Sequence, residues 1–304
     1  MKFIYIINIL IVAITWNSRL HAQDTHFTLH TEAEQPAQTN TPVRHTLSVG
    51  AFGGLQTLTY QLTNRGERSS GFSAGGGIGY ALHLTRLLSI GIGADLSNYA
   101  ASLEYKTLGN QIYRASGGRF NYSINDLHEE QSALLLEIPV MIRLTVPAGR
   151  NGHAFRFAGG VRFGWPASAR YTRSLKHKTL TAFLDYESTE YNFDDIFRPN
   201  APVVITGQTG AIRLNTSLQI AAEIAYRIPL FARSGLSICA FFSYGLNDMQ
   251  DKSKKQLVTY SISDSDLNSS PPKYTYSGSL LNTAFASSIR PLAFGVKLQF
   301  ELGL

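Results

Sequence analysis

Nine charged residues stand at alternate positions inside segments that are otherwise apolar or small. They comprise four acids and five bases: Asp95, Glu137, Glu223, Glu301, Arg143, Arg156, Arg162, Arg213 and Lys297. A carboxylate sheltered from water can bind a ligand or transfer a proton, but it can equally form an ion pair with an arginine on a neighbouring strand. Because the two signs nearly balance, we favour a structural ion-pair network and expect no catalytic residue, cofactor or metal ion.

These charges belong to a set of eight segments in which apolar residues alternate with small or polar ones. The segments span 46–52, 72–82, 88–96, 136–144, 155–165, 214–226, 236–244 and 292–304. A period of two indicates β-strands, because a helix would repeat its apolar positions every 3.6 residues. Within the fourth segment, Pro139 has no N–H group and therefore predicts a break in the hydrogen-bond ladder, with a bulge or bend.

The connections between segments alternate in length. Short turns are expected around 83–86, 147–152 and 228–235, and long loops around 54–70, 104–131, 174–208 and 247–286. Outer-membrane barrels have short periplasmic turns and long extracellular loops, with an even number of antiparallel strands. The sequence therefore predicts an all-β fold: an eight-stranded antiparallel up-and-down transmembrane β-barrel with long extracellular loops.

The placement of charge supports a membrane barrel. All nine charges fall on the strand face opposite the apolar residues, and a charge facing lipid at mid-membrane costs about 2–4 kcal/mol. A soluble lipocalin-like barrel would show the reverse pattern, and a soluble β-sandwich is the remaining alternative. Since the interior of eight strands is only wide enough for side chains, we expect a closed polar lumen. Aromatic residues near the strand ends, namely Tyr80, Tyr99, Phe163, Trp165, Tyr226 and Tyr244, predict interfacial girdles.

The N-terminal region predicts export. Residues 1–22 resemble a cleaved signal peptide, with Lys2, an apolar run of about 13 residues and Ala22 before the cleavage point. An uncleaved anchor is the alternative, although a spanning helix needs about 20 apolar residues. Residues 23–43 are expected to form a polar periplasmic tail, and residues 44–304 the outer-membrane β-barrel domain.

The composition excludes several other classes. Without Lys2 and Arg19, 25 basic and 21 acidic residues remain from the 27 and 21 of the full chain, a scattered net charge of +4 that does not indicate nucleic-acid binding. The single Cys239 cannot form an internal disulfide. The glycine-rich stretch 75–79 lies within a strand pattern, so it does not indicate a phosphate-binding loop.

Four stretches carry a family resemblance. The segment LEIPVMIRL at 136–144 resembles the LEIPxLxK/R strand of the PorT-like outer-membrane β-barrel family of Bacteroidota. The stretches at 157–161, 244–248 and 294–298 are similar to later strands of that family, and the resemblance covers roughly 44–304. It implies a cell-envelope barrel, and some members of the family are linked to protein secretion and gliding.

We therefore expect a non-enzymatic outer-membrane protein with a structural or interaction role through its surface loops. One alternative is an accessory component of a secretion or gliding machine. Another is an outer-membrane lipid-modifying enzyme, for which His128 with Asp126, and His177 with Ser174, are the local candidates. Expected partners are outer-membrane lipid and lipopolysaccharide, the barrel assembly machinery during biogenesis, and an envelope protein. Neither a cofactor nor nucleic acid is expected.

Overall fold

The computed structural model describes residues 45–63, 66–113, 118–149, 152–184, 189–192, 204–231, 233–251, 253, 256–261, 273–276 and 278–304. The expected signal peptide at 1–22 and tail at 23–43 lie outside this part of the chain. The described residues form β-strands and one short 3-10 helix, η1 (Leu280–Asn282). No helix among them has the length and hydropathy to cross a membrane.

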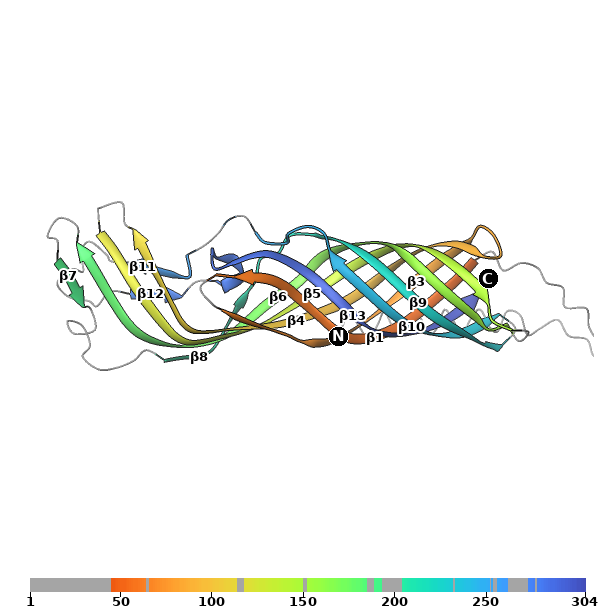
Figure 1. Cartoon of the computed structure of the whole chain (residues 1–304), viewed down its shortest axis with the longest axis horizontal. Helices are drawn as coiled ribbons and strands as arrows, with labels where there is room; N and C mark the ends of the chain where they lie inside the picture. Colours follow the sequence, from red (N-terminus) through yellow and green to blue (C-terminus); the bar gives the residue numbers. More distant parts are fainter. Residues whose placement is uncertain are drawn as a thin grey trace, which may run out of the picture. The chain divides into compact units, whose positions relative to one another are not determined.

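Eight strands of the described chain form a closed ring in which each strand runs antiparallel to both neighbours (Figure 1). In order around the ring they are β1 (His45–Leu62), β3 (Phe72–His83), β4 (Leu88–Tyr113), β5 (Gly118–Pro147), β6 (Ala154–Leu184), β9 (Ser217–Phe231), β10 (Ser234–Gly245) and β13 (Ala286–Gly303). The pairing of β1 with β13 closes the ring. Ring neighbours follow one another along the chain, so the predicted up-and-down barrel is confirmed.

The remaining strands lie along or beyond the ring. β2 (Glu67–Ser70) pairs with β4, and both β7 (Thr189–Asn192) and β8 (Val204–Ala211) pair with β6. A separate two-stranded sheet is formed by β11 (Val258–Ser261) and β12 (Lys273–Tyr276). All of these short strands belong to the connections that were predicted to be long.

The short turns cluster at one end of the barrel. In the turn between β3 and β4, the Leu84 amide donates to the Leu88 carbonyl at 2.9 Å. Between β5 and β6, the Ala148 amide donates to the His153 carbonyl at 2.8 Å. Gly149 in that turn has a φ of +87°, a left-handed conformation that favours glycine. Tight turns here fix the register of the strands that they join.

Four strands continue well past the predicted segments. β1 runs to Leu62, so part of the predicted loop 54–70 is strand. β4 and β5 stay paired as far as Tyr113 and Arg119, and β5 and β6 as far as Gly118 and Leu184 (Figure 1). Much of the predicted loops 104–131 and 174–208 is therefore strand. The physical reason is that the period of two persists while its polarity inverts: inward positions such as Leu103 become apolar and outward positions such as Glu104 become polar.

Candidate functional site

The barrel interior has two levels with opposite chemistry. At the level where the outer surface is apolar, the interior holds charged and hydroxyl side chains, which we call the lumen network: Asp95, Glu137, Arg143, Arg156, Arg162, Glu223, Lys297 and Glu301. Farther from the short turns, the interior is filled by apolar side chains, including Leu58, Leu103, Tyr105, Leu127 and Leu135.

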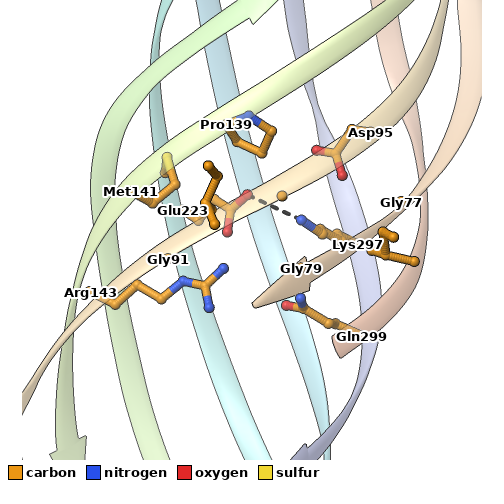
Figure 2. Close-up of a pocket in the computed structure, with 13 residues that line it drawn as sticks. Gly77, Gly79, Gly91, Asp95, Pro139, Met141, Arg143, Glu223, Lys297 and Gln299 are labelled. Carbon is orange, nitrogen blue, oxygen red and sulfur yellow. Dashed lines mark hydrogen bonds and ion pairs between the residues drawn. The ribbon is translucent and has the colours of Figure 1, made fainter. Parts of the chain in front are cut away.

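Inward-facing glycines make room for the long charged side chains. Gly77 and Gly79 on β3 and Gly91 on β4 form a smooth wall beside the lumen network (Figure 2). A Cβ atom at Gly77 would lie 1.9 Å from Asp95 Oδ1, and one at Gly91 would lie 2.9 Å from Arg143 Cζ. The glycine-rich stretch of β3 therefore provides space inside the barrel, where larger side chains would collide with the charges.

Glu137 and Arg162 form the centre of the lumen network. The Glu137 carboxylate, which is fully buried, accepts hydrogen bonds from Ser97 Oγ at 2.6 Å, Tyr99 Oη at 2.8 Å and Gln219 Nε2 at 2.5 Å. Arg162 Nη1 donates to Glu137 Oε2 at 3.3 Å. With four donors around one carboxylate, the hydrogen-bonding capacity of this group is satisfied by its neighbours.

Arg162 joins three carboxylates. Its guanidinium lies 3.3 Å from Glu137, 3.3 Å from Glu223 and 3.5 Å from Asp95. Lys297 Nζ also lies 3.4 Å from Glu223 Oε1, and Figure 2 shows this pair reaching across the interior. Strands β4, β5, β6, β9 and β13 are thus cross-linked through their inward side chains.

Glu301 forms a second centre nearer the short turns. It accepts a paired hydrogen bond from Arg156, whose Nη2 lies 2.8 Å from Glu301 Oε2, and the Nη1–Oε1 contact completes the pair. Arg227 Nε lies 3.4 Å from Glu301, and Ser237 Oγ donates to it at 2.8 Å. A paired arginine–carboxylate contact fixes both side chains in geometry.

A small cavity lies between the two centres. It is lined by Arg143, Asp95, Glu223 and Lys297 together with Gln299 and the glycine wall (Figure 2). Its volume of about 10 Å³ corresponds to about one water molecule. This cavity is far smaller than an open diffusion path would need.

Arg213 does not belong to the lumen network, and its predicted inward position is wrong. The side chain is exposed, and the residue lies between β8 and β9, where the chain leaves the ladder. Its backbone N–H and C=O both bond to the Asn282 side chain, at 3.0 and 2.7 Å. The alternation of inward and outward side chains in β9 begins only at Ser217. The irregular stretch before it changes the face on which a side chain such as Arg213 lies.

Tyr99 also departs from the sequence prediction. It was expected in an interfacial girdle, but it is fully buried inside the barrel and bonds to Glu137. Outward aromatic positions such as Phe163, Trp165 and Tyr226 are exposed on the outer surface. Pro139 interrupts the β4–β5 ladder between Ile92 and Asp95, yet the register is the same on both sides, so no bulge forms there.

A plug closes the apolar level of the interior. Residues 279–285, including η1, form this plug, and all of them except Ala284 are buried, as are Met249 and Gln250. Gln250 Nε2 donates to the carbonyls of Leu281 at 2.9 Å, Thr283 at 3.1 Å and Ala286 at 2.7 Å. These bonds satisfy the backbone of a segment that is otherwise packed among apolar side chains.

Glu129 anchors this plug. Its fully buried carboxylate accepts from Ser279 Oγ, from the Leu280 amide at 3.2 Å and from Gln131 Nε2 at 3.0 Å, with Arg173 Nη1 3.9 Å away. Burial raises the pKa of Glu129, and the hydrogen bonds oppose that shift. Glu129 was not predicted as a site residue, because 104–131 was assigned to a loop. The alternation of Leu127, Glu129, Gln131 and Ala133 was the available signal.

The outer surface of the barrel carries an apolar belt. Outward side chains of the ring are large, apolar and exposed, for example Ile142 at 60%, Ile224 at 56% and Val296 at 54%. Soluble proteins bury such residues, so a continuous exposed belt over a polar interior is the distribution of a barrel embedded in lipid.

The candidate pair of His128 with Asp126 is not assembled. His128 Nε2 lies 3.6 Å from Glu130, while Asp126 pairs with Lys176 at 3.3 Å, and all four side chains are exposed. The side chain of His177 lies outside the described residues. Within the part of the chain that the structure describes, no group of three His, Cys, Asp or Glu side chains is placed to hold a metal ion.

Comparisons with known proteins give resemblance in structure alone. No family model matches the chain, and no curated protein sequence matches it. Neisserial surface protein A (NspA) is 9% identical, with 86% of this chain and 97% of that chain covered and a TM-score of 0.36. OprG of Pseudomonas aeruginosa is 9% identical, with 86% and 97% covered and a TM-score of 0.37. The translocator domain of the autotransporter NalP from Neisseria meningitidis is 9% identical, with 88% and 90% covered and a TM-score of 0.23. These likenesses assign no function.

Proposed function

We propose that the chain is a closed, non-enzymatic outer-membrane barrel that acts through the part extending beyond its apolar belt. One observation carries this proposal: the interior is filled at two successive levels, by the lumen network and by the plug. A protein with a filled interior cannot conduct solutes through it. Its work must therefore be done on its outer surface or at its ends.

The belt supports a membrane location. Closed barrels and helices are the structures that satisfy every backbone hydrogen bond within a lipid bilayer, because lipid offers no bonding partners. Barrels of eight antiparallel strands with short turns at one end are typical of bacterial outer membranes. The N-terminal pattern at 1–22 supports export, and we propose that it is cleaved and that the assembly machinery then inserts the barrel.

The extended strands support an interaction role. β4, β5 and β6 run on beyond the belt as paired strands, and their described side chains there are apolar on the inner face and polar on the outer face. A polar surface carried on paired strands suits the binding of an external ligand or an envelope partner, because a backbone already held in a ladder loses less conformational entropy on binding.

The resemblance of LEIPVMIRL to the PorT-like family supports a more specific role as an accessory component of a secretion or gliding machine. Crosslinking in intact cells followed by mass spectrometry of the purified barrel tests it. Recovery of a defined envelope complex supports that role. Recovery of the barrel alone favours an independent surface protein.

Conductance in planar lipid bilayers tests the closed interior. We expect the full-length protein, folded into the bilayer, to give no stable conductance steps above the leak of the bare membrane. A matched variant lacking plug residues 279–285 should behave in the same way, because the lumen network still fills the belt level. Reproducible single-channel steps from the intact protein would overturn the proposal.

A further inference from the structure

A groove of about 350 Å³ lies on the outer wall of the barrel, beyond the apolar belt. It crosses β4, β5 and β6, and β2 borders it on one side. Two rows of outward side chains form its floor and rim, and paired neighbours in the ladder place them side by side: Ala100, Ser132 and Arg170 in one row, and Ser102, Glu130 and Thr172 in the next. We call this surface the outer groove.

The floor of the outer groove is small and polar. Gly71 approaches so closely that its amide bonds to the Ala100 carbonyl at 3.0 Å, and a Cβ atom at Gly71 would lie 2.7 Å from the Ala100 Cβ. No aromatic or branched apolar side chain points outward into the groove. Protein partners usually anchor through buried aromatic or arginine side chains in apolar pockets, which this surface lacks.

Two opposite charges stand at the rim. Among the described residues, the one ion-pair partner of Glu130 is the His128 ring, whose Nε2 lies 3.6 Å from Glu130 Oε1. Arg170 has no carboxylate within ion-pair distance among the described residues, and it is exposed. An arginine without a partner presents its planar set of donors to a ligand, and phosphate is the group that those donors fit best.

The height of the groove above the apolar belt limits which class of ligand can reach it. Ser132 lies four residues along β5 from Leu136, which is 45% exposed at the edge of the belt beside Trp165. At about 3.3 Å per residue, this is about 13 Å of strand. With the strand tilt of a barrel, it corresponds to about 10 Å along the membrane normal. The groove therefore continues the lipid-facing surface into the layer of lipid head groups.

We propose that the outer groove binds the sugar-phosphate head group of a glycolipid in the outer leaflet. Arg170 holds the phosphate, while Glu130 accepts hydrogen bonds from sugar hydroxyls and Ser102, Ser132 and Thr172 exchange them. The acyl chains of the same molecule lie against the apolar belt below. This inference rests on the proposed outer-membrane location, and it adds a defined lipid site to that location.

The test measures glycolipid binding to the folded full-length barrel by native mass spectrometry. The probes are rough lipopolysaccharide and, for comparison, phosphatidylglycerol. Arg170→Ala removes the phosphate ligand, and Ser132→Trp fills the floor. Lys176→Ala is the charge-matched control on the same strand, and Gln61→Trp is the size-matched control on β1; both positions are exposed and lie outside the groove.

We expect roughly tenfold weaker binding of lipopolysaccharide by Arg170→Ala, the usual effect of losing a charged hydrogen bond. We expect a loss at least as large for Ser132→Trp, because its indole ring occupies the space of the head group. We also expect unchanged binding by both controls and weaker binding of phosphatidylglycerol than of lipopolysaccharide. Equal lipopolysaccharide binding by wild type and groove variants would overturn the inference, as would equal affinity for the two lipids. Folding of every variant is checked by its heat-dependent mobility on gels. A wild-type protein that fails to enter outer membranes would instead contradict the proposed function.

Discussion

Removing Arg162 should destabilise the barrel more than removing any other cation of the lumen network. Its side chain is 3% exposed and lies within 3.5 Å of Asp95, Glu137 and Glu223. In Arg162→Met, Glu223 keeps Lys297, and Glu137 keeps its hydroxyl and amide donors. Asp95 loses the ion pair that the structure gives it. Breaking one buried ion pair costs about 3–5 kcal/mol, because the remaining charge is left uncompensated.

The structure also supplies a control and a rescue. Arg227 forms an ion pair with Glu301 at 3.4 Å, but its side chain is 28% exposed and Glu301 retains Arg156. Arg227→Met should therefore cost at most about 1 kcal/mol. In the double variant Arg162→Met with Asp95→Asn, the orphaned charge is gone, and part of the loss should be recovered.

Urea unfolding of the barrel in lipid vesicles, followed by tryptophan fluorescence and by mobility on gels, measures these differences. The reasoning is refuted if Arg162→Met and Arg227→Met cost the same, since burial and partner number would then have no influence. It is also refuted if adding Asp95→Asn to Arg162→Met lowers the stability further, because the lost pairing would then not explain the cost.

Two further predictions concern the outer belt and the plug. Ile92→Arg places a charge at an outward position whose native side chain is 52% exposed, and it should destabilise the barrel in vesicles by about 2–4 kcal/mol. The control Gln61→Arg, beyond the belt, should change stability by at most about 0.5 kcal/mol. Equal effects of the two substitutions would contradict the assignment of Ile92 to the lipid-facing surface. Because burial raises the pKa of Glu129 above its usual 4.5, its contribution is fully present below the unfolded pKa and is lost as pH rises through the folded pKa. The wild-type Tm should fall over that window more steeply than the Tm of Glu129→Gln, and identical pH profiles would argue against this role.

The part of the barrel inside the apolar belt was predictable from the sequence, because outward side chains there must be apolar and charged side chains must face inward. Along β13, every even position from Leu292 to Leu302 is apolar, while Lys297 and Glu301 occupy the other face. In a bilayer the solvent is uniformly apolar, so a strict alternation leaves a single acceptable orientation of the strand. The strand count, the closed ring and the inward side of most charges follow from this constraint.

Beyond the belt the same rule fails, because water replaces lipid outside and the apolar face must turn inward. The parts of β4 and β5 beyond the belt were therefore predicted as loops although they are strands. Glu129, on the inward face of β5, was missed for this reason. Arg213 shows a related limit. Odd and even positions predict the face of a side chain only while the strand stays paired, and the chain around Arg213 leaves the ladder. The plug was also beyond prediction, since Gln250 and Leu281 meet only through long-range folding.

The native cysteine offers the most direct test of a closed interior. Cys239 is 1% exposed on the inward face of β10, opposite Lys297 of β13, and is the one cysteine of the chain. A membrane-impermeant methanethiosulfonate reagent is added to the barrel in vesicles, with Gln61→Cys in a Cys239→Ser background as the exposed control. The account predicts rapid labelling of the control and no labelling of Cys239 until the barrel is unfolded. Labelling of Cys239 in the folded barrel at the rate of the control would show a water-filled lumen and contradict it.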